Sequence, residues 1–221
     1  MQALLNLFFI TIASAHAIPL QGRAPPVERT STTEEGRRSL VTIAPGTSSC
    51  HSASVFIDEC RTASEAAQPI LDSFDKYQIA NTNERAALIA LMLYESGEFK
   101  YNWSHFVNGE ISHMLGKGTR NMQSAKYNEE YARTLFPSEE VDSAKSSGGA
   151  DGVLQLVSRD STSFASAAWF LVSQCDSSVR SGLQAGTRDG LERYVSDCIG
   201  GTIDQSRLDY WTKTKAALSD G

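Results

Sequence analysis

Apolar residues recur at helical spacing over most of the chain beyond residue 59, and this pattern predicts a mainly α protein. In the clearest case, Asn83-Glu84-Arg85 is followed by a run that is apolar on every side. A helix that is apolar all round is typical of a buried central helix. This one should end at Glu95-Ser96-Gly97, because Gly97 can adopt the left-handed conformation of a helix C-cap. Further helices are expected over 61–77 (one kinked or two short helices), 124–135, 163–174, 188–198 and 204–218.

Two segments interrupt this helical pattern. Residues 99–122 lose the period and contain Gly109, Gly116 and Gly118, which predicts loops or a small hairpin. Residues 137–152 are polar and read as a surface loop. The predicted fold class is therefore mainly α, with at most a small β-hairpin region.

The first 38 residues differ in composition from the rest. Residues 4–12 form an apolar run that precedes Ala15-His16-Ala17, which fits a signal-peptidase site and predicts a signal peptide over 1–17. The run is far shorter than the ~20 apolar residues of a membrane-spanning helix. Residues 18–38 contain three prolines and no apolar period, so we expect a disordered tail, or a pro-segment ending at Arg37-Arg38. The remaining 39–221 would be one secreted, extracellular domain.

Charge and cysteine content narrow the function classes. A formal net charge of −6 argues against a nucleic-acid partner. An even count of cysteines in a secreted chain predicts two disulfides. Of the three possible pairings, Cys50–Cys60 with Cys175–Cys198 closes two local loops and is favoured. No zinc-like spacing occurs, so no metal site or cofactor is expected. Asn102-Trp103-Ser104 is the sole glycosylation sequon, so Asn102 is a predicted glycan acceptor; the alternative is that the sequon is unused because its loop lines a cleft.

Glu95 is the residue best placed for chemistry. It lies in the last turn of the predicted central helix, close in sequence to Tyr94, Phe99 and Trp103. Burial, the negative end of the helix dipole and the neighbouring aromatic rings would all favour a protonated carboxyl group. A general acid needs that form near neutral pH. The alternative is a helix-terminal glutamate whose carboxylate lies in solvent.

Several stretches in fixed order resemble the lysozyme-like superfamily, most closely family 19 glycoside hydrolases, which include chitinases and phage endolysins. Glu95-Ser96 at the helix end is also similar to goose-type lysozymes and lytic transglycosylases. The matching stretches run from about Ile70 to Leu218, and they are the following: 70–79, 85–90 with 95–99, Gly116-Lys117-Gly118-Thr119-Arg120-Asn121-Met122-Gln123 with Tyr127-Asn128, Ser163 to Phe170, and Ile199-Gly200-Gly201 with Arg207-Leu208 and Tyr210-Trp211.

The resemblance implies a bilobed helical fold with a sugar-binding cleft and hydrolysis of β-1,4 links in N-acetylated polysaccharides. Glu95 would be the general acid. The substrate-binding positions implied by the matching stretches are Arg120, Asn121, Gln123, Tyr127, Asn128 and Ser104.

Two positions depart from the family pattern. Ser104 stands where the family has a second catalytic glutamate, and Ile199 replaces an asparagine before Gly200-Gly201. An inverting glycosidase wants a second carboxylate roughly 6.5–9.5 Å from the acid, and Glu110 is the nearest candidate. The losses shift the expectation from chitinase towards muramidase-like cleavage of peptidoglycan.

The sequence thus predicts a secreted, monomeric glycoside hydrolase that acts on peptidoglycan or chitin with Glu95 as its acid. A non-catalytic carbohydrate-binding or effector protein on the same scaffold is the alternative, motivated by Ser104 and Ile199. A hydrolase inhibitor or structural wall protein is the third hypothesis. The acidic charge of the domain favours a neutral substrate such as chitin, because an acidic protein is repelled by an anionic wall at low salt.

Overall fold

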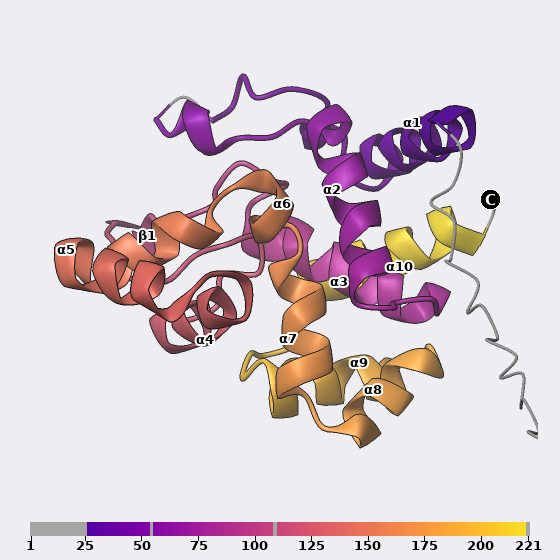
Figure 1. Ribbon diagram of the computed structural model, residues 1–221. Coiled ribbons are helices and arrows are strands. Elements are labelled where there is room, and N and C mark those ends of the chain that lie inside the picture. Colours follow the sequence, from indigo (N-terminus) through magenta and orange to yellow (C-terminus); the bar gives the residue numbers. More distant parts are fainter. Residues whose placement is uncertain (1–25, 54, 108–109, 220–221) are drawn as a thin grey trace, which may run out of the picture.

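A computed structural model describes residues 26–53, 55–107 and 110–219 of the chain, and the predicted signal peptide over 1–17 lies outside them. The prediction of a mainly α fold is confirmed, with one two-stranded sheet (Figure 1). The elements in chain order are α1 Pro26–Ile43, η1 Pro45–Ser48, η2 Ile57–Glu59, α2 Ala63–Lys76, α3 Thr82–Glu95, β1 Phe106–Val107, β2 Glu110–Ile111, α4 Ala125–Leu135, α5 Ser138–Val157, α6 Asp160–Ser163, α7 Ser166–Gln174, α8 Ser177–Gln184, α9 Arg188–Arg193, η3 Tyr194–Cys198 and α10 Gln205–Ser219.

The predicted buried central helix is α3, which lies in the middle of the ribbon between α2, α7 and α10 (Figure 1). Every residue from Ala86 to Leu93 is buried. Asn81 caps the start of the helix, because its side-chain oxygen accepts the backbone N–H groups of Asn83 and Glu84 at 2.9 and 3.2 Å. Buried on all sides, α3 delivers Glu95 at a fixed place.

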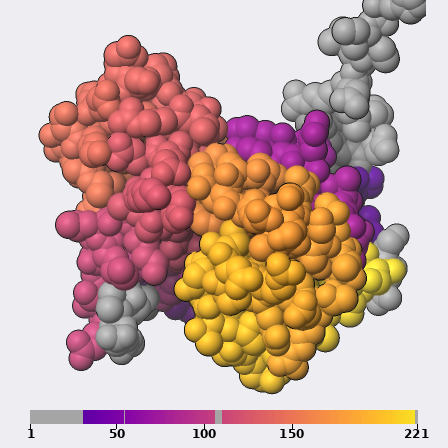
Figure 2. All heavy atoms as spheres, turned by 90° about the horizontal axis from the view of Figure 1, so that it is seen from below, coloured from indigo at the N-terminus to yellow at the C-terminus, as the bar shows by residue number. Residues whose placement is uncertain are grey.

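Two hydrophobic clusters divide the domain. The first surrounds α3 and takes side chains from α1, α2 and α7 to α9. The second joins α4 and α5 through Tyr131, Val141 and Leu154. Helix α7 serves both, since Leu171 packs in the first cluster while Trp169 and Phe170 pack in the second. The two parts meet along a seam between the pink-to-red and the orange-to-yellow surface in Figure 2.

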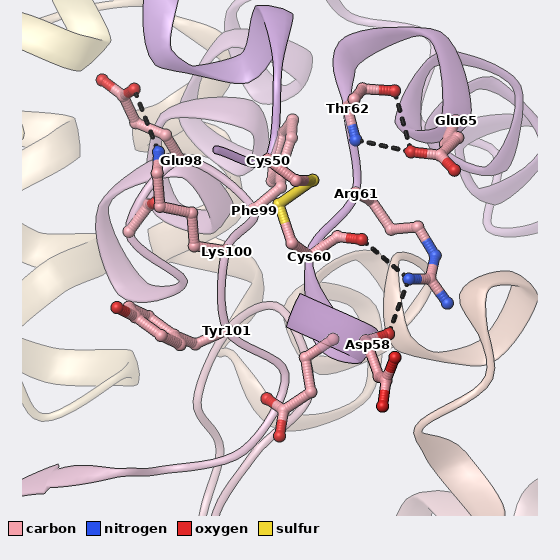
Figure 3. The surroundings of a disulfide bond; sticks show 12 residues. Cys50, Asp58, Cys60, Arg61, Thr62, Glu65, Glu98, Phe99, Lys100 and Tyr101 are labelled. Atoms are coloured by element: carbon pink, nitrogen blue, oxygen red, sulfur yellow. Dashed lines mark hydrogen bonds and ion pairs between the residues drawn. A yellow bond between two sulfur atoms is a disulfide. The ribbon is translucent and has the colours of Figure 1, made fainter. Parts of the chain in front are cut away.

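A disulfide and a capping box fix the start of α2. Cys50 and Cys60 are bonded, and the chain then enters α2 through Thr62 (Figure 3). The Thr62 backbone N–H donates to the Glu65 carboxylate at 2.8 Å, and the Glu65 backbone N–H donates back to the Thr62 side chain, which is the reciprocal pattern of a capping box. Helix α2 is one continuous helix with Pro69 inside it. The second disulfide joins Cys175 to Cys198, so the structure contains the pairing that the sequence favours.

Two predicted irregular segments are helical instead. The prediction of a disordered tail over 18–38 is wrong from residue 26 onward, where the chain belongs to α1. Neither α1 nor α5 has a strong apolar face, so hydrophobic periodicity does not predict them. Contacts with neighbouring helices stabilise them instead. Gly36 of α1 packs on Ala67 and Leu71 of α2.

Helix α5 replaces the surface loop predicted over 137–152. Ion pairs join it to α4: Lys145 meets Glu129 at 2.6 Å, and Arg133 meets Asp142 at 2.7 Å. A kink at Gly149, with φ of +61°, interrupts α5 in the Ser-Gly-rich stretch that suggested a loop.

The predicted small hairpin is β1–β2. The strands are antiparallel, with Phe106 opposite Ile111 and Val107 opposite Glu110. Within the part of the chain that the structure describes, no helix has both the length and the apolar character needed to cross a bilayer.

Candidate functional site

A cleft of about 370 Å³ opens between the two parts of the domain. One side comes from the loop after the hairpin and the start of α4, and the other from the end of α3, the 199–201 turn and α10. The lining residues are Glu95, Met114, Lys117, Asn121, Met122, Gln123, Ser124, Tyr127, Phe170, Ile199, Gly200, Gly201 and Arg207. We call Asn121, Gln123 and Tyr127 the amide wall, and Glu95, 199–201 and Arg207 the ion-pair wall.

The ion-pair wall is built around Glu95. One carboxylate oxygen lies 2.5 Å from Nη2 of Arg207, and the two side chains are only 20% and 12% exposed. The sequence predicts a carboxyl group that stands alone among aromatic rings. The structure instead gives Glu95 a guanidinium partner from α10, more than a hundred residues away along the chain. The two charges cancel within the cleft.

Two further contacts hold Arg207, and a third joins their partners. Its guanidinium lies 3.8 Å from the centre of the Tyr94 ring, a cation–π contact. Its backbone N–H donates to Asp204 at 2.8 Å, and the Tyr94 hydroxyl donates to the same aspartate at 2.5 Å. The hydrogen bond from Tyr94 lowers the pKa of Asp204, and the bond to Asp204 raises the pKa of Tyr94. Asp204 therefore stays charged at the start of α10, where the helix dipole favours an anion.

The amide wall is a chain of neutral hydrogen bonds. Asn121 donates to the Gln123 carbonyl oxygen at 3.1 Å, and Gln123 donates to Asn128 at 2.8 Å. Asn128 in turn donates to the Gly116 backbone at 2.8 Å, and Ser166 of α7 donates to Asn121 at 2.8 Å. An amide nitrogen has two N–H groups, so Asn121 and Gln123, which each donate one bond within the wall, keep further donor capacity, whereas Asn128 donates to the backbone of both Gly116 and Gln123. Tyr127 packs edge-on against Phe170, with ring centres 4.8 Å apart.

The backbone of this wall is strained. Thr119 and Met122 have φ of +63° and +50°, a region that side chains other than glycine seldom adopt. Gly118 lies between them and the hairpin, bridged to both Trp103 and Gln123. A Cβ at Gly118 would come within 2.6 Å of the Asn102 carbonyl oxygen, so only glycine fits. Strain of this kind is often found at ligand sites.

Arg120 does not line the cleft, contrary to the prediction. Its side chain is fully buried and donates to the carbonyl oxygens of Phe99, Tyr101 and Glu59 at 2.7–3.0 Å. Its guanidinium also lies over the Phe164 ring. Burial lowers the pKa of Arg120 to about 10. Arg120 therefore stabilises the loop behind the cleft and is not placed to bind a ligand in the cleft.

Three other predicted site residues also lie elsewhere. Asn128 is fully buried and holds Gln123 from behind. Ser104 is buried away from the cleft, and its carbonyl oxygen contacts His113 Nδ1 at 3.0 Å. Glu110 is exposed on β2 and does not line the cleft. Periodicity and motif spacing could not reveal this, because the loop folds back on itself.

The predicted glycosylation site is inaccessible in the folded chain. Asn102 is 5% exposed, its amide nitrogen donates to the Ser158 carbonyl oxygen at 2.6 Å, and its amide oxygen accepts from Ser163. The sequon is therefore part of the contact between the loop and α6, and its prediction as a glycan acceptor is corrected.

Sequence reasoning missed Arg207 and Lys117 as cleft residues. Both fall within the stretches that carry the family resemblance, but neither was assigned a role there. Arg207 becomes recognisable only when α10 packs against α3. Lys117 brings a second positive charge to the cleft, so the cleft carries two cations and one anion.

The rim of the cleft bears exposed apolar side chains. Ile111 and Leu115 are 72% and 71% exposed, and Met114 lines the cleft itself. Two contacts of Asp151 in α5, which we call the latch, hold the base of this rim. His113 Nε2 lies 2.9 Å from the Asp151 carboxylate, and the same carboxylate accepts the Gly116 N–H at 2.7 Å. Burial acts to lower the pKa of His113, but the bonds to Asp151 and to the Ser104 carbonyl oxygen, together with the nearby negative charges, outweigh it and raise that pKa.

No metal centre is evident at the site. Among the described residues, no group of three or more His, Cys, Asp or Glu side chains is close enough together to hold a metal ion. All four cysteines are in the two disulfides.

Comparison with known proteins gives one informative relative. The chain is 33% identical over 165 residues to a bifunctional dioxygenase–epoxy alcohol synthase of Fusarium oxysporum (strain Fo5176). The match covers 70% of this chain but only 12% of the relative's length. No family model matches the chain, and no solved structure matches it. The resemblance to the lysozyme-like superfamily therefore stays a prediction.

This relative overturns the predicted activity. It is named for dioxygenase and epoxy alcohol synthase activities, which belong to oxidoreductase or isomerase-type enzymes, and not for glycoside hydrolysis. The prediction that the chain is a glycoside hydrolase, whether muramidase-like or chitinase-like, is accordingly wrong, as are the hydrolase and glycosidase labels. The catalytic roles predicted for Glu95 and Glu110 belonged to that activity and are not carried further.

Proposed function

We propose that the chain is a ligand-binding module whose cleft holds an uncharged, hydrogen-bonding chain, with N-acetylated polysaccharide as the ligand class. The Glu95–Arg207 pair carries the proposal, because its two charges offset each other and, apart from Lys117, the other side chains that line the cleft are neutral. Amide side chains recognise acetamido and hydroxyl groups by hydrogen bonds, and aromatic rings pack against the apolar faces of sugar rings.

The small share of the relative that the match covers supports a module. A segment that makes up 12% of a long protein is one part among several, and the fold shown here has its own two hydrophobic clusters. We also propose that the module works outside reducing compartments, because all four cysteines are paired in disulfides and cytosolic thiols are kept reduced.

Titration calorimetry with chitin oligosaccharides tests the proposal. Wild-type protein should give saturable binding, and Tyr127→Ala should weaken it about ten-fold, ~1.4 kcal/mol, because truncating an aromatic contact at the centre of a site has an effect of this size. Tyr101→Ala removes an aromatic side chain that is also half-buried but does not line the cleft, so its affinity should equal that of the wild type. Absence of saturable heat from the folded wild-type protein would refute the proposal.

A second candidate function follows from the relative's name. The matched segment could take part in the dioxygenase or epoxy alcohol synthase activity of that protein. The test is to delete the matched segment from the relative and measure oxygen uptake and epoxy alcohol formation. Loss of either activity from a deletion protein that remains folded would favour this candidate, whereas unchanged rates would favour a separate binding module.

A further inference from the structure

A small cavity adjoins the ion-pair wall and shares Arg207 with it. Its volume is about 10 Å³, and its lining residues are Ala87, Ala90, Leu91, Leu191, Tyr194, Val195 and Arg207. The aliphatic members are at most 5% exposed, and Tyr194 is 1% exposed. Arg207 lines both this cavity and the cleft.

Two polar atoms of the cavity residues lack a protein partner. Within the described chain, Tyr194 Oη and Arg207 Nε are both buried and form no hydrogen bond. A buried polar group left without a partner costs roughly 1–3 kcal/mol, so native proteins rarely leave one unpaired. Both atoms belong to residues that line the same cavity, which suggests one third group as the partner of both.

Only a very small ligand fits this geometry. A cavity of about 10–15 Å³ has room for the centre of one water molecule, and a buried water needs two or more polar partners. Burial raises the pKa of Tyr194, so its hydroxyl is neutral and can both donate and accept. Arg207 Nε–H can only donate, so water, which accepts and donates, matches both groups.

We propose that this cavity is a site for one structural water molecule that bridges Tyr194 Oη and Arg207 Nε, and that Tyr194 is thereby a positioning residue for the cleft. The water accepts from Nε–H and donates to, or accepts from, the tyrosine hydroxyl. Nη2 on the other part of the guanidinium then meets Glu95. With Nε held by the water and Nη2 held by Glu95, the plane of the guanidinium is fixed in the ion-pair wall.

The widened turn η3 brings Tyr194 into this position. Tyr194 follows α9 directly and begins the π-helical segment that ends at Cys198. The disulfide to Cys175 fixes the far end of this segment. Single π-helical turns are rare and are frequently found at functional sites. The same short segment thus supplies the buried hydroxyl and leads directly into the 199–201 part of the ion-pair wall.

A high-resolution crystal structure tests the water site directly. Electron density for one water within about 3.2 Å of both Tyr194 Oη and Arg207 Nε is expected. An ordered structure with a dry cavity, or with Nε bonded to another protein atom, would overturn the proposal. This result does not depend on glycan binding, so it can succeed or fail independently of the proposed function.

Tyrosine-to-phenylalanine variants test the positioning role. Tyr194→Phe removes one of the two partners of the water, so solvent exchange of the Arg207 Nε–H, followed by NMR, should become about ten-fold faster. Tyr210→Phe is the matched control: Tyr210 is on the same helix as Arg207 but donates to Glu98, and exchange should stay as in the wild type. Equal exchange rates in all three proteins would contradict the role of Tyr194.

The affinity readout of this variant pair rests on the proposed function. Tyr194→Phe should weaken binding of a chitin oligosaccharide about three- to ten-fold, and Tyr210→Phe should leave it unchanged. Unchanged affinity in Tyr194→Phe would remove the positioning role while leaving the binding proposal intact. Loss of binding already in the wild type would remove the proposed function, and the density and exchange results would still decide the water site.

Discussion

The two walls of the cleft are held by different kinds of interaction. The amide wall comes from one short stretch, which runs from a loop into α4 and is held by neutral hydrogen bonds and a strained backbone. In the ion-pair wall, a salt bridge and a cation–π contact join α3 to α10, and the Cys175–Cys198 disulfide holds the segment that leads into the 199–201 turn. The first wall should therefore depend on local steric fit, and the second on charge and covalent cross-linking.

The largest effect is expected from removing the cross-link of the ion-pair wall. Replacing Cys175 and Cys198 together by serine should cost about 3.4 kcal/mol in unfolding free energy, from loop closure over 23 residues. Affinity for chitin oligosaccharides should fall as well, because Cys198 precedes the 199–201 turn. Urea unfolding and calorimetry measure the two quantities.

The other disulfide provides the matched control for this cross-link. The double serine variant of Cys50 and Cys60, which closes a shorter loop, should cost about 2.7 kcal/mol but leave affinity unchanged. Equal loss of affinity in both double variants would contradict the specific role of Cys175–Cys198 in the ion-pair wall.

The steric fit of the amide wall is tested at Gly118. A Cβ there would meet the Asn102 carbonyl oxygen at 2.6 Å and a Leu154 methyl at 2.8 Å, so Gly118→Ala should destabilise the fold by about 3 kcal/mol. Gly148→Ala is the control, because nothing lies within 4 Å of its added methyl. That variant should be neutral or up to about 1 kcal/mol more stable in thermal unfolding. Similar melting temperatures for both variants would show that the loop can move to make room for the Gly118 methyl group, and they would contradict the steric fit.

The hydrogen-bond chain of the amide wall is tested at Asn128. Asn128→Ala removes the acceptor of Gln123 and the donor to Gly116, and it should cost about 2 kcal/mol by leaving buried groups unpaired. Arg133→Ala on the exposed face of the same helix should change unfolding free energy by less than about 0.5 kcal/mol. An equally small effect at Asn128 would mean that water replaces its side chain, and the wall would not be a closed network.

The charge of the ion-pair wall is tested at Glu95. Glu95→Gln leaves Arg207 without its counter-ion, and the expected cost is about 1 kcal/mol at low salt, decreasing as salt screens the pair. The same salt series on Asn128→Ala should show no such trend, because that network is neutral. A salt-independent cost at Glu95 would remove the distinction between the two walls.

The smallest predicted effect concerns the latch at the cleft rim. The raised pKa of His113 contributes stability that is fully present below its unfolded value of about 6.5 and is lost as pH rises through the folded value. In Asp151, burial acts to raise the pKa, but the bonds from Gly116 and His113 lower it. Its contribution is present above its unfolded value of about 3.9 and is lost as pH falls through the folded value.

The latch should therefore be strongest between about pH 4 and pH 6.5. Asp151→Asn should reduce unfolding free energy by up to about 0.5 kcal/mol in that range, and less at pH 9. A pH-independent difference between variant and wild type would show that the bond to Gly116 alone matters.

The comparison of the two walls also explains what the sequence could predict. The buried central helix and the position of Glu95 at its end follow from local pattern, and the structure confirms both. Asn121, Gln123 and Tyr127 come from one continuous stretch, and they line the cleft as expected. The partner of Glu95 could not be predicted in the same way, because Arg207 meets it only through packing of α10 on α3.

The sequence also could not predict which polar side chains of the irregular segments are buried. Arg120, Asn128 and Asn102 lie in or next to a loop, and polar loop residues are ordinarily taken to face solvent or ligand. Here the loop folds back on itself and satisfies its own backbone, so these side chains point inward. Helices α1 and α5 were missed because neither has the apolar periodicity from which a helix is predicted.

The central claim is that the cleft binds an N-acetylated oligosaccharide between its two walls. An NMR titration with a chitin oligosaccharide tests it most directly, with the side-chain amide signals of Asn121 and Gln123 and the Arg207 Nε–H signal as reporters. We predict saturable shifts of these signals, while the side-chain amide signal of Asn102, buried outside the cleft, stays in place. Unchanged cleft signals at millimolar ligand, or shifts confined to residues outside the cleft, would contradict the account.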